Sequence, residues 1–381
     1  MEMDAEIGVE MGMEMRSELK WSRLEEAARS VYSYMMHSRP DEWGGHQWSD
    51  WAMNREKWDW NPGVGIVAAV QFGLAIGDER ILEETEDWIS RNLAESGATK
   101  VINTMAPYAV FPMLYVETGK AFYKEKTREI AYWMVNEAPQ TREGAFEHTV
   151  TENASFREQI WADTLFMAVL FLARAARLLN SRYLADEALK QVLIHLRALQ
   201  DEHTGLVYHG WNCETADWMS GASWNRANAW IACGIPMILS EVESVSGGSD
   251  TLDEIKGRYL KLAMALAKCQ HASGLWPTVL DYPDYYEETS GSAGIAYGLY
   301  LAVKQNLVPH TMKGHADQAL EGLLRQINER GVVAGVSGGT PVLASLEAYN
   351  EVPVFPTLYG QGLTLLLLTE ALGQQTRAGV Q

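Results

Sequence analysis

The sequence predicts an all-α protein with the architecture of an (α/α)6 barrel, in which an outer ring of helices surrounds an inner ring. Three observations lead to this prediction. Segments with one charged face alternate strictly with segments that are apolar on nearly all sides, each kind occurs six times, and the longer connections mostly follow the charged segments. A helix with a polar stripe belongs at the surface, whereas a helix that is apolar all round must be buried.

The outer helices are predicted from segments with a single apolar stripe. In 181–199, for example, Leu184, Ala188, Val192 and Leu196 recur at helical spacing beside charged residues. The segments of this kind are 18–36, 78–94, 120–136, 181–199, 250–270 and 312–329.

The inner helices are predicted from segments that have no polar, solvent-exposed face. Between Leu165 and Ala173, for example, the chain is apolar without a break. The segments of this kind are 63–76, 104–118, 162–179, 224–245, 292–307 and 357–373. Six repeats of one half-buried and one buried helix favour a closed double ring, which we expect to span residues 18–381 as one domain.

The connections from outer to inner segments are mostly long, and in a ring they lie together on one face. Such loops are usually functional. They run over about 37–62, 95–103, 137–161, 200–223, 271–291 and 330–356.

These loops and their junctions are rich in aromatic side chains and histidine. The residues are Trp43, Trp48, Trp51, Trp58, Trp60, Trp161, Trp211, Trp218, Trp224 and Trp276, with His46, His148, His203, His209 and His271. An aromatic cleft with a few polar groups suits a sugar, whose apolar faces stack on flat rings. The alternative is that the tryptophans only fill the top of the barrel.

Composition excludes several partners. The net charge of -19 disfavours nucleic acid and anionic membranes. The three cysteines have no metal-binding spacing, so we expect no disulfide framework, metal or cofactor.

Residues 1–17 are predicted to be a flexible acidic leader without the features of a signal peptide. No apolar run is long enough for a membrane span, so we expect a cytoplasmic protein.

Asp163 is the strongest catalytic candidate. It stands between Trp161 and a fully apolar segment, and apolar walls raise the pKa of a carboxyl group so that it can hold a proton near neutral pH. Ser155 and Glu158 have the spacing of a capping box, which predicts a helix start just before it. The competing interpretation is an ordinary acid in the first turn of that helix.

Arg226 is the strongest anion-binding candidate. It lies at the start of the segment 224–245, where a cation gains nothing from the helix dipole. An anion shared by Arg226 and the helix end, such as a sugar carboxylate, would remove this misfit. The glycine-rich stretch 335–341 lacks the lysine of a phosphate loop, and the motifs GxxxxGK[ST], GxGxxG and HExxH are absent from the sequence.

Several motifs, in order along the chain, resemble those of glycoside hydrolase family 105, the unsaturated rhamnogalacturonyl hydrolases, and of the related family 88. They are INTMAP, YVETG, WADTLFMAVLFLAR, TGLVYHGW, WNRANAW and ETSGSAGIAYGL. The resemblance implies removal of a 4,5-unsaturated galacturonyl or glucuronyl residue from the non-reducing end of lyase-generated oligosaccharides. In such enzymes an aspartate protonates C4, water adds at C5, and the hemiketal opens; the matching residue is Asp163.

The resemblance also implies a set of substrate-binding residues. These are Asn103, His148, Trp161, His209, Trp211, Trp224, Arg226, Asn228 and Trp230. Asn103 stands where many relatives carry a second aspartate, and Ala227 replaces a glycine of the family pattern. Two alternatives stay open: a sugar epimerase of the N-acylglucosamine type that uses His148 and His209 as acid and base, and a carbohydrate-binding barrel without catalysis.

Overall fold

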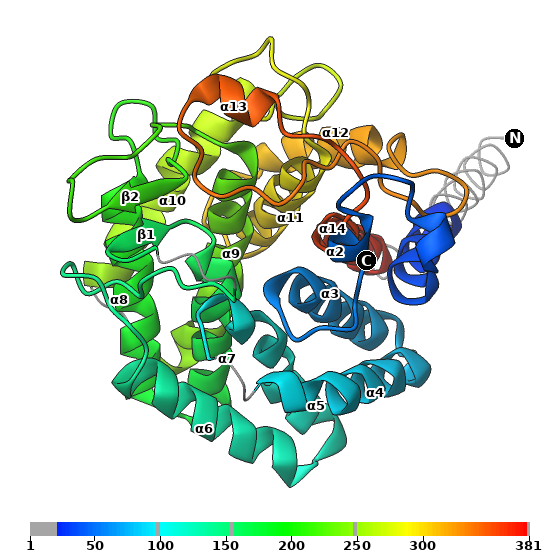
Figure 1. The fold of residues 1–381 in the computed structure, drawn as a ribbon, viewed down its shortest axis with the longest axis horizontal. Helices are drawn as coiled ribbons and strands as arrows, with labels where there is room; N and C mark the ends of the chain where they lie inside the picture. Colours follow the sequence, from blue (N-terminus) through cyan, green and yellow to red (C-terminus); the bar gives the residue numbers. More distant parts are fainter. Residues whose placement is uncertain (1–20, 97–99, 152–155, 247–249, 379–381) are drawn as a thin grey trace, which may run out of the picture.

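The structure, a computed structural model, describes residues 21–96, 100–151, 156–246 and 250–378. The predicted leader, residues 1–17, lies outside the described residues. Helices surround the centre of the molecule in chain order, from blue through green to red in Figure 1. The alternation of helix types therefore predicted the arrangement of the chain.

The inner ring closes on itself. Each inner element packs on the next one along the chain, and the last, α14, packs on the first, α3. The inner elements are α3 (Trp60–Ile76), η2 with α5 (Asn103–Val110 and Phe111–Thr118), η3 with α7 (Leu165–Val169 and Leu170–Leu179), α9 (Asn225–Ser246), α11 (Thr289–Lys304) and α14 (Leu358–Ala378). The (α/α)6 prediction is confirmed by this closure.

The outer ring consists of amphipathic helices that lie against the inner elements. Residues 21–37 form its first helix. The others are α4 (Glu79–Ser96), α6 (Ala121–Asn136), α8 (Arg182–Leu199), α10 (Asp250–Cys269) and α12 (Met312–Leu324). α12 ends earlier than expected, since the chain turns there and Ile327 pairs with Val333.

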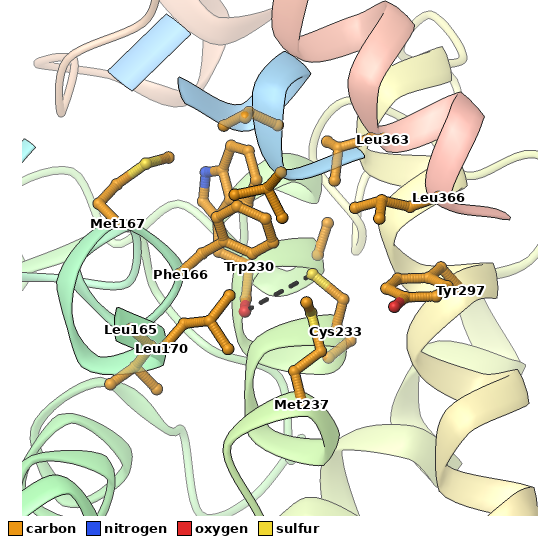
Figure 2. Packing of buried hydrophobic residues seen from close by; sticks show 14 of the residues in the cluster. Leu165, Phe166, Met167, Leu170, Trp230, Cys233, Met237, Tyr297, Leu363 and Leu366 are labelled. Atoms are coloured by element: carbon orange, nitrogen blue, oxygen red, sulfur yellow. Dashed lines mark hydrogen bonds between the residues drawn. The ribbon is translucent and has the colours of Figure 1, made fainter. Parts of the chain in front are cut away.

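The core lies where the inner helices meet. In Figure 2, Phe166 and Leu170 approach α9 at Trp230 and Met237, and Leu363 of α14 lies on the other side. All of these side chains are buried. The unbroken apolar run after Asp163 is thus explained by contact with neighbours on every side.

The loop face carries the remaining regular elements. They are η1 (Pro40–Glu42), α2 (Ser49–Ala52), β1 (Gln159–Trp161), β2 (Gly210–Asn212) and α13 (Leu346–Asn350). β1 and β2 form a two-stranded antiparallel ribbon in which Trp161 pairs with Gly210. This ribbon joins the loops before α7 and α9, and so brings residues near 161 and 209 together.

The expected helix start at Ser155 and Glu158 is wrong. Ser155 lies outside the described residues, and Glu158 has a positive φ of 58°. The carboxylate of Glu158 accepts a hydrogen bond from the backbone N–H of Arg142 at 3.0 Å instead of capping a helix. The chain then forms β1, turns at Asp163 and enters η3, a π-helical segment; such segments occur often at functional sites.

The three cysteines, two buried and one half-buried, are free thiols. Within the described ranges, no helix is both long and apolar enough to cross a membrane.

The close approach of α9 and α11 depends on Gly298. A Cβ atom there would lie 2.1 Å from the carbonyl oxygen of Ala232. We expect Gly298→Ala to lower the free energy of unfolding by about 1–3 kcal/mol, because the two helices must separate. The matched control is Gly257→Ala on the exposed side of α10, where nothing lies within 4 Å of the added methyl group. This control should stabilise by roughly 0.5–1 kcal/mol, since alanine favours helix. Urea unfolding measures both, and equal stability of the two variants would contradict this account of the packing.

Candidate active site

A cavity of about 600 Å³ opens on the loop face. Its walls come from the beginnings of inner elements and from the long loops before them. The lining residues are Trp48, Trp51, Trp60, Asn103, His148, Val150, Phe156, Trp161, Asp163, Met167, Gly338, Gly339, Thr340, Pro341, Val352, Pro353 and Phe355. Of the predicted site residues, Asn103, His148, Trp161 and Asp163 are therefore together at this cavity.

Asp163 occupies the turn between β1 and η3. Its carbonyl oxygen accepts hydrogen bonds from the N–H groups of Phe166 and Met167 at 3.1 and 3.0 Å, which anchor it to the first turn of the inner helix. The side chain is 15% exposed, and its Oδ2 atom lies 3.4 Å from Nε2 of His209. Within the described part of the chain, neither of these two atoms has a well-formed hydrogen bond. The carboxylate is thus held in place by its backbone and is available to a ligand.

The expected rise in the pKa of Asp163 is wrong. Burial acts to raise it, but interaction with His209, the nearby His148 and the charge of Arg226 together lower it below the usual value for aspartate. The sequence showed the apolar neighbours in the same segment but not the polar groups brought in from other segments. Asp163 is therefore ionised at neutral pH in the free protein.

His209 is buried beside Asp163. The backbone N–H of Ala162 donates to the carbonyl oxygen of His209 at 3.1 Å, which ties the two segments together. The imidazole packs on Trp224 with ring centroids 4.2 Å apart, and its Nδ1 atom lies 2.8 Å from the hydroxyl of Tyr349. Burial lowers the pKa of His209 more than Asp163 raises it, so the ring is neutral at neutral pH.

His148 forms a second buried imidazole at the cavity. Its Nδ1 atom lies 3.0 Å from the hydroxyl of Thr164, and its ring stacks on Trp161 at a centroid distance of 4.3 Å. Burial lowers the pKa of His148 to about 4. At neutral pH this histidine is uncharged and offers a hydrogen bond rather than a positive charge.

Asn103 presents a free acceptor at the cavity. Its backbone N–H donates to the carbonyl oxygen of Thr149 at 3.1 Å, which places it at the start of η2. Its side chain is 6% exposed, and Oδ1 has no hydrogen-bond partner in the described structure. A buried acceptor without a partner is costly, which favours a hydroxyl or water donor at this point.

Arg226 lies behind the cavity wall. Its guanidinium group donates to the carbonyl oxygens of Ser337 and Gly338 at 3.0 and 2.8 Å, and it lies 3.6 Å from the carboxylate of Glu288. It is sandwiched between the rings of Trp224 and Tyr359. The unfavourable position of this cation at a helix start is thus offset by Glu288 within the protein and not by a ligand. The guanidinium group does not line the cavity, so its charge acts there only through space.

Three other predicted site residues are not at the cavity. The side-chain amide of Asn228 bonds both the N–H and the carbonyl oxygen of Val207, at 2.9 and 2.8 Å, so it joins a loop to α9. Trp230 is fully buried against Phe166 in the core. Trp211 packs edge-on against Trp218. None of the three is among the described residues that line the cavity, and their role as substrate-binding residues stays a prediction.

The last long loop was predicted to lie on this face, but none of its residues was predicted to line the site. Gly338, Gly339 and Phe355 line the cavity, and a Cβ atom on Gly339 would lie 2.6 Å from the ring of Trp51. The glycines of 335–341 were the available signal, because a close approach of the backbone requires them. Tyr349 carried no such signal. Among the described residues, no group of three or more His, Cys, Asp or Glu side chains could hold a metal ion.

Comparisons with known proteins find a glycoside hydrolase family and unsaturated uronyl hydrolases. Residues 27–374 match Glycosyl Hydrolase Family 88. The chain is 33% identical over 324 residues to the unsaturated rhamnogalacturonyl hydrolase YesR of Bacillus subtilis, covering 84% of this chain and 91% of that one. It is 27% identical over 219 residues to an unsaturated 3S-rhamnoglycuronyl hydrolase of Alteromonas, covering 56% of this chain and 51% of that one. A Klebsiella pneumoniae structure, described as a possible member of the GH105 family, superimposes with a TM-score of 0.85 at 32% identity and 93% coverage of both chains.

The buried Glu288 is predicted to stabilise the wall that contains Ser337 and Gly338. Glu288→Gln removes the charge that balances Arg226, so we expect the free energy of unfolding to fall by about 3–5 kcal/mol. The adjacent Glu287→Gln is the matched control. Glu287 is 34% exposed and contacts His271 at the surface, so its loss should cost less than about 1 kcal/mol. Chemical denaturation measures both variants, and a similar loss for the two would refute the importance of the buried pair.

Proposed function

The chain belongs to Glycosyl Hydrolase Family 88, and we propose that it removes a 4,5-unsaturated uronic acid from the non-reducing end of an oligosaccharide by hydrating the C4=C5 enol ether. The names of the two curated relatives support this substrate class. Membership of a hydrolase family favours this reaction over the epimerase and over a binding protein without catalysis.

One observation carries the proposed mechanism: Asp163 is the only carboxylate among the described residues that line the cavity. Displacement at an anomeric carbon ordinarily needs two carboxyl groups on opposite sides of the glycosidic bond. Hydration of an enol ether needs one group that gives a proton and later takes one back. A single acid in an aromatic cavity therefore supports hydration.

In the proposed reaction, the carboxyl group of Asp163 delivers its proton to C4 and the C4=C5 π bond is consumed. A water oxygen bonds to C5, and the carboxylate takes a proton from that water. The resulting hemiketal opens, and the remaining saccharide leaves as an alcohol. The sum is the addition of one water molecule, and Asp163 ends in the protonation state in which it began.

Proton uptake by Asp163 is proposed to accompany substrate binding. The free carboxylate is ionised because its pKa is lowered. The unsaturated uronate brings a second anion into a cavity lined mostly by aromatic and other apolar side chains, and two like charges there cannot both persist without cost. The substrate thus raises the pKa of Asp163 and helps to load the proton that is then delivered to C4.

We propose that the protein recognises the sugar both by stacking on aromatic rings and by hydrogen bonds. Trp161 offers a ring face, Asn103 offers the free Oδ1 acceptor, and His148 offers an uncharged imidazole at the cavity. His209 contacts Asp163, with Trp224 behind it and the charge of Arg226 beneath the wall.

The leaving sugar is proposed to be uncharged. None of the described lining residues is a lysine or arginine, and Trp48 and Phe355 offer apolar faces in that wall. A neutral sugar stacks on such faces, whereas a sulfated sugar would find no cation there. The relative named for a rhamnogalacturonyl substrate makes an unsaturated galacturonyl-rhamnose disaccharide the first compound to test.

Asp163→Asn tests the assignment of the acid. An amide has no carboxyl proton to give, so we expect turnover to fall by at least about 10²-fold while binding of the disaccharide is retained. Loss of the ultraviolet absorbance of the enol ether measures turnover, and calorimetry measures binding. Turnover near that of the unaltered protein would exclude Asp163 as the proton donor. If the unaltered protein leaves unsaturated disaccharides of every lyase class intact, the proposed function itself fails.

The pH dependence of kcat/KM tests the protonation of Asp163 in the free protein. Its pKa is lowered, so the protonated fraction falls as pH rises through the neutral range. We expect kcat/KM to decline between about pH 6 and pH 8 by up to roughly tenfold per pH unit, the limit for one proton. The profile of kcat should be flatter, because bound substrate raises the pKa of Asp163. A kcat/KM that is constant or increases over this range would contradict the mechanism.

A further inference from the structure

Tyr349 connects the last long loop to the proposed acid. It lies on α13, its side chain is fully buried, and its hydroxyl lies 2.8 Å from Nδ1 of His209, which is 140 residues away in sequence. The other ring nitrogen of His209 faces Asp163 at 3.4 Å. Tyr349, His209 and Asp163 therefore form one line that ends at the cavity.

The direction of the hydrogen bond between Tyr349 and His209 follows from the other contacts of the hydroxyl. The backbone N–H of Leu343 donates to this oxygen at 3.1 Å, so one of its acceptor positions is filled. The hydroxyl of Ser220 is farther away, at 3.5 Å. The single phenolic proton is thus best placed to be donated to Nδ1 of His209, which is neutral at neutral pH because burial lowers its pKa.

Packing alone does not select the protonated nitrogen of His209. The ring lies against Trp224 and Trp161, with centroid distances of 4.2 and 5.4 Å, and these contacts set its plane. Ring contacts are nearly the same for both neutral forms of imidazole, and only the hydrogen-bond partners distinguish them. Among the described residues, the partner within 3 Å of the ring is Tyr349.

We propose that Tyr349 is a positioning residue for the hydrolase, because its hydroxyl holds the proton of His209 on Nε2, where it faces the carboxylate of Asp163. With the proton on Nδ1 instead, a lone pair would face the carboxylate and repel it. The correct form stabilises Asp163 after it has given its proton to C4. This role rests on the proposed function.

A double-mutant cycle tests whether Tyr349 acts through His209. Tyr349→Phe removes only the hydroxyl, and we expect kcat to fall roughly tenfold with little change in KM, a part of the 10²–10⁴-fold that acid–base groups contribute. His209→Gln keeps an N–H donor near the position of Nε2 but has no second ring nitrogen to be protonated. In that background Tyr349→Phe should change kcat by less than about twofold, since glutamine has no second tautomer that Tyr349 could disfavour.

Tyr286→Phe is the matched control. Its hydroxyl lies 3.5 Å from the backbone carbonyl of Tyr349 and has no contact with His209, so we expect kcat to stay within about twofold of the unaltered protein. Equal losses from Tyr349→Phe in both backgrounds would show that Tyr349 only supports the loop, and would overturn the proposal.

A spectroscopic measurement tests the proposal without turnover. In protein labelled with ¹⁵N-histidine, we expect His209 to show a protonated Nε2 and a bare Nδ1, with the signal assigned by its loss in His209→Gln. Tyr349→Phe should shift the signal towards a mixture of forms, and Tyr286→Phe should not. A protonated Nδ1 in the unaltered protein would overturn the proposal. This measurement needs no substrate, so its result is independent of whether the unsaturated disaccharide is hydrolysed.

Discussion

The buried ion pair between Arg226 and Glu288 is the interaction on which the rest of the site depends. Arg226 lies in the first turn of α9, and Glu288 caps the start of α11 by accepting from the N–H groups of Ser290 and Gly291. The guanidinium group also holds the Ser337–Gly338 backbone. A charge buried in this way is tolerated only when it is balanced and hydrogen-bonded. One cation thereby joins two inner helices to the loop that completes the cavity.

That loop gives the ion pair its functional importance. After Gly338 it continues along the cavity wall, forms α13 with Tyr349 and returns to the wall at Phe355. The carboxylate of Asp163 lies 3.4 Å from Nε2 of His209, whose ring contacts Tyr349 of this loop. The site therefore lies between β1 with η3 on one side and the last loop on the other. Arg226 holds that loop in place through its hydrogen bonds to Ser337 and Gly338.

The electrostatics of the cavity reconcile an acidic protein with an anionic substrate. The chain carries a net charge of -19, and the described lining residues contribute only the negative charge of Asp163. The two buried histidines are neutral, whereas the guanidinium group of Arg226 lies just behind the wall. A fixed cation in a medium of low dielectric acts over several ångströms. With His209 and His148 it lowers the pKa of Asp163 in the free protein, and it favours entry of the uronate carboxylate.

Much of this protein could be predicted from local pattern. The period of apolar residues determined the twelve main helical segments and their order, because a helix without a polar face has to be buried. The same pattern placed Asp163 and the aromatic loops on one face. Tertiary structure alone decided the direction of the pKa shift of Asp163, the partner of Arg226 and the place of Trp230 in the core. These properties depend on groups from distant parts of the chain, such as His209 and Tyr349. Closure of the ring and the course of its longest loops bring these groups together, so residue spacing within one segment could not predict their contacts.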